Sequence, residues 1–187
     1  MEDFKTVTSS QTVLTELMIP SYSNFGGKIH GGIILGLMDK VAYACAAKHA
    51  GNYCVTVSID TVNFLQPVEV GELVSLMASV NYVGKSSMVV GIRVQSENIK
   101  TQEIKHTNSS YFTMVAIGDE HKPATVPGLI LQSHLEVQRF YQAYHRKELN
   151  RYYKQEADRI KTPMEIAESI ELIKTERCIV DLPSDKL

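Results

Sequence analysis

The residues with the clearest potential for chemistry lie in one stretch, 24–51. Asp39 is a single acid inside an apolar run that repeats at helical spacing, where an unpartnered carboxylate is costly to bury. Its side chain therefore either points to solvent beside Lys40 or faces a site that uses it. Gly31 and Gly32 precede this run, and the free N–H groups at the start of a helix attract negative charge. One carboxylate near such donors could supply a base or a nucleophile together with a site for a developing anion.

The element that must carry Asp39 is a helix, predicted from about Gly31 or Gly32 to Gly51. Its apolar residues recur at i, i+4, i+7 and i+11, which is one stripe of an α-helix. These residues are Ile34, Met38, Val41 and Cys45. A glycine after the last periodic residue suits the C′ position, so Gly51 is predicted to end the helix.

Five segments have the β-branched and alternating pattern of strands. They are 12–19, before the helix, and 53–65, 73–82, 88–96 and 107–117 after it. Alternation places Val55, Val57, Ile59 and Thr61 on one face of the second segment. The late strands are joined by loops too short for βαβ crossovers, which favours antiparallel neighbours at hairpin spacing. The expected fold class is α+β, with an antiparallel sheet wrapped round one long central helix.

A change in composition after about residue 130 predicts a C-terminal helical extension. The run 134–161 lacks Gly and Pro and is rich in good helix formers, which predicts a long helix. A second helix is predicted to open with Thr162 as N-cap, Pro163 at N1 and Glu165 at N3, the pattern of a capping box. We therefore expect one domain over 8–127 and an extension over 128–187 that serves in packing or assembly.

Composition excludes several classes of protein. The chain has 187 residues, of which 44% are apolar, and a formal net charge of −2. It thus has enough apolar residues for a core and no basic footprint for nucleic acid, and no apolar run approaches the roughly 18 residues of a membrane span. The N-terminus lacks the apolar region of a signal peptide, so a cytoplasmic location is expected.

The three cysteines argue for a protein without a disulfide framework. Cys45, Cys54 and Cys178 are odd in number and lack C-x-x-C spacing, which also argues against a zinc site. Since free cysteines are usually buried, we expect buried thiols.

Three parts of the sequence together resemble the hotdog-fold acyl-CoA thioesterases. The first is Asn24-x-x-Gly27-x-x-x-Gly31-Gly32-x-x-Leu35-x-x-x-Asp39, the second Val57-Ser58-Ile59-Asp60, and the third Phe64-Leu65-x-Pro67-Val68-x-Val70-Gly71-Glu72. The resemblance covers about residues 10–127 and is greatest to the hexameric bacterial acyl-CoA hydrolases. It implies a hotdog fold and the hydrolysis of acyl-CoA to a free fatty acid and coenzyme A.

The resemblance implies a catalytic pair, Asn24 in the loop and Asp39 in the helix, acting across a dimer interface. The coenzyme A thiol, with a pKa of about 8.5, leaves with little protonation, so a base or nucleophile and oxyanion donors suffice. Asp39 could deprotonate a water or attack directly to form an anhydride, and Asn24 would orient the water or the thioester oxygen. The N–H groups of Gly31 and Gly32 could form the oxyanion hole.

Further residues are expected around this pair. His30 packs against or lines the site, since the sequence has no G-x-S-x-G elbow for a Ser-His-Asp triad. By resemblance, Lys85, Ser86 and Ser87 contact the coenzyme A phosphates, although a plain hairpin turn accounts for them equally well. Arg93 is expected to pair with an acid or a ligand phosphate at a subunit interface.

The partners implied by the resemblance are acyl-CoA and further copies of the chain, with a dimer as the minimum unit and a hexamer built as a trimer of dimers. No cofactor is required, because coenzyme A is part of substrate and product, and no metal, nucleic acid or membrane is expected. Two other classes stay open: a hotdog dehydratase or hydratase acting on acyl thioesters, and a non-enzymatic acyl-CoA sensor. The sequence does not set the preferred acyl chain length.

Overall fold

The computed structural model describes residues 3–161 and 165–182 of the chain. The chain divides into two compact units, Met1–Tyr144 and His145–Leu187. The predicted boundary at residue 127 stays a prediction.

Helix α1 (Gly31–Ala50) is the centre of the first unit and has the predicted bounds. His30 is its N-cap, and Gly51 ends it in the left-handed conformation with φ 71°. All four residues of the predicted stripe are buried in the core, which confirms the predicted orientation of the helix.

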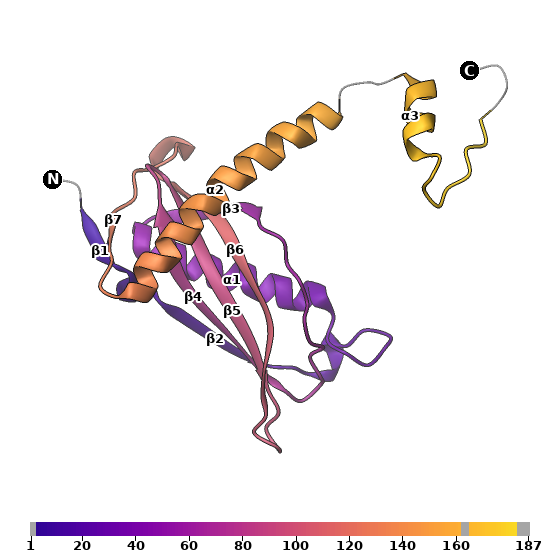
Figure 1. Ribbon diagram of the computed structural model, residues 1–187. Helices are drawn as coiled ribbons and strands as arrows, with labels where there is room; N and C mark the ends of the chain where they lie inside the picture. Colours follow the sequence, from indigo (N-terminus) through magenta and orange to yellow (C-terminus); the bar gives the residue numbers. More distant parts are fainter. Residues whose placement is uncertain (1–2, 162–164, 183–187) are drawn as a thin grey trace. The chain divides into compact units, whose positions relative to one another are not determined.

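A five-stranded sheet curls along α1 (Figure 1). Its strands are β2 (Thr12–Leu17), β3 (Tyr53–Ile59), β4 (Leu73–Val83), β5 (Ser87–Glu97) and β6 (Ile104–Ile117). They lie in the order β2-β4-β5-β6-β3, and every neighbouring pair is antiparallel. One long helix on a curled antiparallel sheet is the hotdog architecture, so the predicted fold class is confirmed.

Strand β3 differs from its prediction in length, partner and facing. It ends at Ile59 instead of continuing to 65, and it pairs with β6 at the sheet edge instead of forming a hairpin with β4. The ladder has an irregularity between Thr56 and Ser58, which breaks the alternation of side chains. As a result Val57 and Ile59 are 61% and 41% exposed, and the predicted common face is wrong beyond this point.

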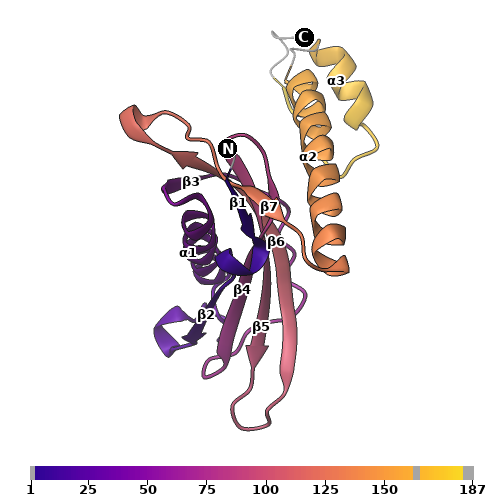
Figure 2. The same ribbon diagram turned by 90° about the vertical axis from the view of Figure 1, so that its left-hand side faces the viewer.

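The two faces of the sheet are covered differently. Alternate residues of the three central strands pack toward α1, among them Val74, Leu76, Val80, Met88, Val90, Phe112 and Met114. On the opposite face the beginning of helix α2 (His134–Ile160) packs through its residues up to Tyr144 (Figure 2). The Tyr82 ring lies 5.2 Å from that of Phe140 and 6.3 Å from that of Tyr144, and Ala143 is buried.

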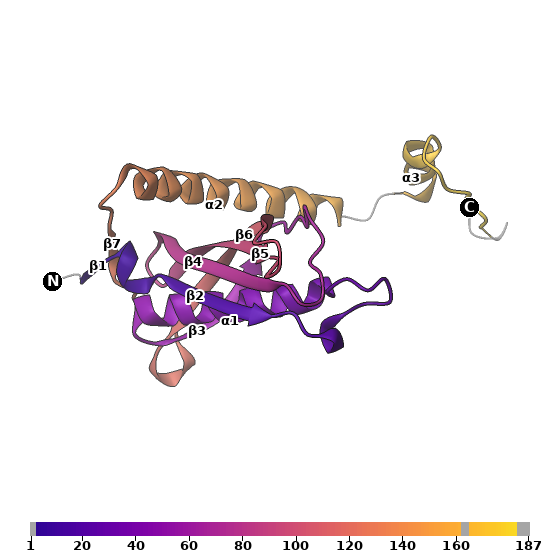
Figure 3. The ribbon, with the colours of Figure 1, turned by 90° about the horizontal axis from the view of Figure 1, so that it is seen from below.

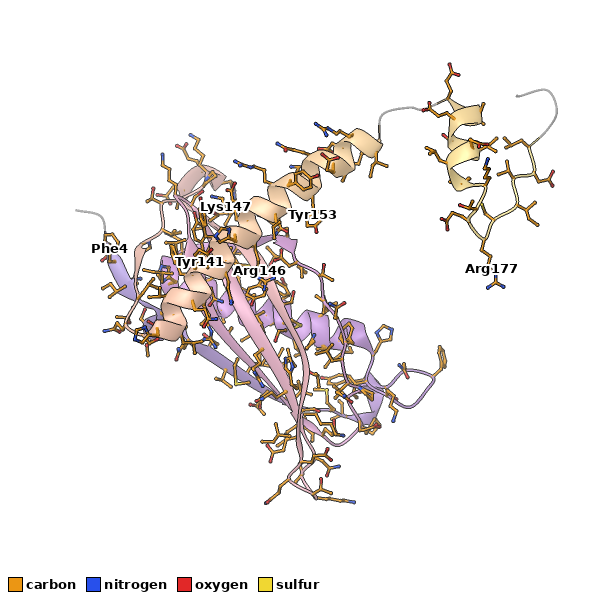
Figure 4. The ribbon with its side chains drawn as sticks, in the orientation of Figure 1. Phe4, Tyr141, Arg146, Lys147, Tyr153 and Arg177 are labelled. Atoms are coloured by element: carbon orange, nitrogen blue, oxygen red, sulfur yellow. The ribbon has the colours of Figure 1, made fainter. Side chains whose placement is uncertain are left out.

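A second, two-stranded sheet lies near the C-terminal end of α1 (Figure 3). Strands β1 (Phe4–Thr6) and β7 (Gly128–Ile130) pair in parallel, and neither was predicted. The Phe4 ring, labelled in Figure 4, lies over Gly128 so closely that a Cβ there would come within 2.3 Å of the ring. Glycine at 128 therefore lets the two strands meet.

The second unit contains the rest of α2 and helix α3 (Ile166–Ile173), so both predicted C-terminal helices exist. The capping prediction is wrong at Glu165, which occupies the N-cap position of α3 instead of N3. Its other members, Thr162 and Pro163, lie outside the described residues.

Candidate active site

Asp39 lies on α1 with its carboxylate exposed in the single chain and oriented by strand β3. The Thr56 hydroxyl donates a hydrogen bond of 2.6 Å to Asp39 Oδ1. A hydroxyl-to-carboxylate bond is charge-assisted, so it fixes the direction of the carboxylate more strongly than a neutral pair would. Of the two readings of Asp39, a solvated helix residue or a member of a site, this oriented geometry favours the second.

A cleft of about 390 Å³ opens beside this carboxylate, between α1 and β3. Its walls are Asp39, Lys40 and Tyr43 from the helix and Tyr53, Cys54, Val55 and Thr56 from the strand. Burial raises the pKa of the Cys54 thiol to about 11, so it is protonated at neutral pH and is a poor nucleophile. Of the two groups, the Asp39 carboxylate is therefore the better candidate for a base or nucleophile in this cleft.

Asn24 lies in a tight loop, residues 23–30, that projects past the N-terminal end of α1 (Figure 3). Its side-chain oxygen accepts hydrogen bonds from the N–H groups of Gly26 at 2.9 Å and Lys28 at 3.2 Å. Its backbone N–H donates to the Lys28 carbonyl at 2.7 Å. Because these bonds occupy the amide oxygen, the Asn24 NH₂ is the group that can act on a ligand, and it acts as a donor.

The two predicted oxyanion donors, the N–H groups of Gly31 and Gly32 in the first turn of α1, differ in whether they already have an acceptor. His30 Nδ1 accepts a hydrogen bond of 3.0 Å from the Gly32 N–H, so this donor is already engaged and His30 is a helix cap. The Gly31 N–H has no acceptor within the helix, as expected for a first-turn position. A Cβ at Gly31 would lie 3.2 Å from the Phe64 ring, so a glycine allows this ring to approach the helix start.

Lys85, Ser86 and Ser87 lie far from this end of α1 in the same chain. Lys85 and Ser86 lie in the turn between β4 and β5, and Ser87 begins β5. Lys85 lines a cavity of about 990 Å³ that also contacts Ala50 at the opposite helix terminus. The backbone carbonyls of Lys85 and Ser86 accept hydrogen bonds from Val126 and Ala116. One chain therefore does not bring this turn to Asp39, and its contact with coenzyme A stays a prediction.

Arg93 lies on the face of the sheet away from α1, and so on the opposite face from Asp39. It lines a cavity of about 420 Å³ with Arg139 of α2. Its guanidinium lies 3.1–3.2 Å from the Gln95 amide, whose oxygen accepts these bonds once the amide is turned. Within the described part of the single chain no carboxylate pairs with Arg93. Its expected partner, an acid or a ligand phosphate at a subunit interface, stays a prediction.

The described residues contain neither a disulfide nor a cluster suited to a metal ion. All three cysteines are free; Cys45 and Cys54 are buried, whereas Cys178 is exposed, so the expectation of burial is wrong for Cys178. Burial raises the pKa of Cys45 to about 12. Among residues 3–161 and 165–182, no group of three or more His, Cys, Asp or Glu side chains is placed to hold a metal ion. Nor does any helix in these ranges have the length and apolar character needed to cross a membrane.

Thr56 is the site residue that sequence reasoning missed. A threonine in a strand is an ordinary β-former, so its residue type gives no warning of a role. Its spacing from Asp39 in the sequence does not predict a contact either. The two residues meet because β3 pairs with β6 and α1 packs on β3. The available signal was the position of Thr56 directly before the motif Val57-Ser58-Ile59-Asp60.

Comparison with known proteins agrees with this geometry. The Thioesterase superfamily model matches residues 26–103. The protein VdlD of Helicobacter pylori is 44% identical over 149 residues, which cover 79% of this chain and 85% of VdlD. A hexameric acyl-CoA thioesterase of known structure is 36% identical with a TM-score of 0.79, covering 81% of this chain and 97% of its own.

The acyl-CoA hydrolase of Staphylococcus aureus, solved with butyryl coenzyme A, coenzyme A and coenzyme A disulfide, is 30% identical with a TM-score of 0.77. The match covers 84% of this chain and 96% of that enzyme. Structures of the same enzyme carry single alanine replacements of an asparagine, an aspartate and a threonine. These three are spaced by 15 and 17 residues, the intervals that separate Asn24, Asp39 and Thr56 here. The chain belongs to the acyl-CoA thioester hydrolase family of the thioesterase superfamily.

Proposed function

We propose that this protein hydrolyses the thioester of acyl-CoA to a free fatty acid and coenzyme A, with Asp39 and Asn24 as its catalytic residues. The observation that carries the proposal is the Asp39 carboxylate, held at 2.6 Å by Thr56 and open to a cleft. The names of the related hydrolases supply the substrate class.

Each group has one task in this reaction. Asp39 either removes a proton from the attacking water or attacks the carbonyl carbon itself, and the carbon–sulfur bond then breaks to release the coenzyme A thiolate. After direct attack, a water hydrolyses the resulting anhydride, which releases the fatty acid and restores the Asp39 carboxylate. The Asn24 NH₂ donates to the thioester oxygen or to the water. The Gly31 N–H stabilises the oxyanion, in a position where loss of one donor typically costs about 10²–10³ in rate.

The proposed site is completed by a second copy of the chain. Strand β3 is an edge strand in the single chain, and Tyr53, Val57 and Ile59 expose apolar surface there. Pairing two such edges about a two-fold axis covers this surface and brings Asn24 of one subunit to Asp39 of the other. We propose that three of these dimers form a hexamer, and the hexameric state of the related thioesterase supports this number of subunits.

The test is thiol release from acyl-CoA by wild type, Asp39→Ala and Asn24→Ala. Each variant should lose most of its turnover, about 10²–10³-fold or more, with an unchanged melting temperature. Full activity in either folded variant would overturn the mechanism. Water addition to crotonyl-CoA without thiol release would instead indicate a hydratase, and binding of acyl-CoA with neither reaction would indicate a sensor.

Complementation tests the shared site. If Asn24 and Asp39 act across a dimer, unfolding and refolding an equal mixture of the two inactive variants produces mixed dimers with one intact site each. Random pairing should then restore roughly a quarter of wild-type activity, as the symmetry of an isologous dimer requires. No recovery in mixed dimers that are shown to form would place both residues in one subunit.

A further inference from the structure

The position of Asn24 depends on a chain of contacts that leads away from the cleft. Lys28 closes the Asn24 loop twice, since its N–H donates to the Asn24 side chain and its carbonyl accepts from the Asn24 N–H. Any shift of the Lys28 backbone therefore moves the Asn24 amide.

Lys28 is itself attached to Glu69, which lies in the turn before β4. The two residues form an antiparallel backbone bridge, and the Lys28 ammonium pairs with the Glu69 carboxylate. The neighbouring Ile29 N–H donates to the Val68 carbonyl at 2.9 Å. The Asn24 loop is thus attached to the segment 68–69 through backbone and side chain.

Glu69 is in turn held by a buried acid, Glu72. The Glu69 N–H donates to Glu72 Oε2 at 3.1 Å, across a turn that Gly71 makes possible with φ 91°. Glu72 is 2% exposed, and its other oxygen has no hydrogen bond among the described residues, with the Lys105 ammonium 3.6 Å away. A buried carboxylate with so few partners is expensive to retain for stability alone.

We propose that Glu72 is a positioning residue for Asn24, acting through Glu69 and Lys28. Glu72 fixes the Glu69 backbone, Glu69 fixes Lys28, and Lys28 holds the Asn24 oxygen so that the NH₂ points toward the partner's cleft. The inference rests on the proposed function of Asn24 and adds to it a set of residues outside the cleft.

The first test compares Glu72→Met with Glu72→Gln in thiol release from acyl-CoA. Glutamine keeps an acceptor for the Glu69 N–H, whereas methionine has a similar length and no such oxygen. We expect kcat to fall about 10–100-fold in Glu72→Met with little change in KM, and to stay within about 3-fold of wild type in Glu72→Gln. Equal activity of the two folded variants would overturn the inference.

A double-mutant cycle separates positioning from general destabilisation. In an Asn24→Ala background, assayed at high enzyme concentration, Glu72→Met should cost less than about 2-fold, because the group that it positions is already gone. A loss as large as in the wild-type background would show that Glu72 does not act through Asn24. Full activity in the single variant Asn24→Ala would refute the proposed function. Full activity in Glu72→Met, with activity lost in Asn24→Ala, would refute the positioning role and leave the proposed function intact.

The exposed ion pair between Lys28 and Glu69 provides a second test, which applies even if Glu72→Met does not fold. The Lys28 and Glu69 side chains are 47% and 39% exposed, so substitutions there are tolerated by the fold. Lys28→Glu should lower kcat about 3–5-fold, and the exchange Lys28→Glu with Glu69→Lys should restore it. The matched control is Lys122→Glu, which breaks the exposed ion pair with Glu120 and should leave kcat unchanged. An unaltered kcat in Lys28→Glu, or no restoration by the exchange, would contradict the link.

Discussion

The two ends of helix α1 differ in what they leave available. At the N-terminal end, most of the loop 23–30 is exposed, and the Gly31 N–H lacks an acceptor within the helix. Asp39 is exposed near the middle of the helix. At the C-terminal end, Gly51 closes the helix, the Lys5 ammonium donates to the His49 carbonyl at 2.8 Å, and His49 is fully buried. The β1–β7 pair lies beside this second end.

This difference shows how one helix serves two purposes. The C-terminal end satisfies its backbone groups within the chain, so it contributes to stability and offers a ligand little. The N-terminal end retains polar groups that, in the proposed function, bind the ligand and a second subunit, and leaving them unpaired should cost stability in the isolated chain. Substitutions at the two ends should therefore separate activity from stability.

After Asp39→Ala and Asn24→Ala, the largest effect is expected for Thr56→Val, which removes the donor to Asp39 while keeping the shape of the side chain. Loss of a charge-assisted hydrogen bond should lower kcat about 10–100-fold. The melting temperature should change little, since Thr56 is only half-buried. Steady-state thiol release and thermal unfolding measure the two quantities, and Thr56→Ser, which keeps the hydroxyl, is the control. Wild-type kcat in Thr56→Val would remove this residue from the site.

A matched pair of glycine substitutions tests the comparison directly. Gly27 and Gly51 have nearly the same backbone, φ 74° and 71°, and a Cβ at either would meet no atom within 4 Å. Alanine at each should therefore cost about 1 kcal/mol of strain alone. Both substitutions should lower the free energy of unfolding. Gly51→Ala should leave kcat unchanged, whereas Gly27→Ala, which lies in the Asn24 loop, should lower kcat about 10-fold. Equal kcat values in the two variants would contradict the separation of roles.

The smallest effect is expected from the titration of His49. Burial is the main cause that lowers the pKa of His49 from its ordinary value of 6.5, and the nearby Lys5 ammonium adds to it. Below about pH 6.5 the unfolded chain therefore binds a proton that the folded chain does not, so stability is full above this pH and falls as the pH decreases. His49→Gln, which keeps a donor for the Pro127 carbonyl, should show a smaller fall in melting temperature between pH 7.5 and 5.5. An identical fall in both proteins would exclude His49 as the cause.

The sequence predicted the parts of the fold whose periodicity is regular. The stripe along α1 and the alternation of β4 and β5 reflect burial on one face, which a pattern of residues records. The prediction for β3 is too long because Phe64 and Leu65 are apolar and strand-like, whereas the regular strand ends at Ile59. Beyond it, the Asp60 and Leu65 N–H groups still donate to carbonyls of β6. The strands β1 and β7 have three residues each, too few for a period to be recognised.

The site was predictable in part for a similar reason. Asp39 was recognised because an acid contradicts its apolar surroundings, and Asn24 because its spacing to Asp39 matches a known motif. Thr56 is a typical strand residue in its local sequence, so its contact with Asp39 can be recognised only from the packing of α1 on β3. The motif that contains Glu72 predicts no role for it, because its link to Asn24 depends on contacts between separate segments of the chain.

The protonated state of Cys54 has a consequence for the fate of the acyl group. If acyl-CoA binds in the cleft beside Asp39, as proposed, Cys54 offers a competing reaction, in which transfer of the acyl group to its sulfur would leave that group covalently attached to the protein. Attack of this kind needs a thiolate, and burial keeps the Cys54 pKa near 11. In the proposed reaction the acyl group would therefore pass to water and not to Cys54, so that the enzyme would not be inactivated by its own substrate.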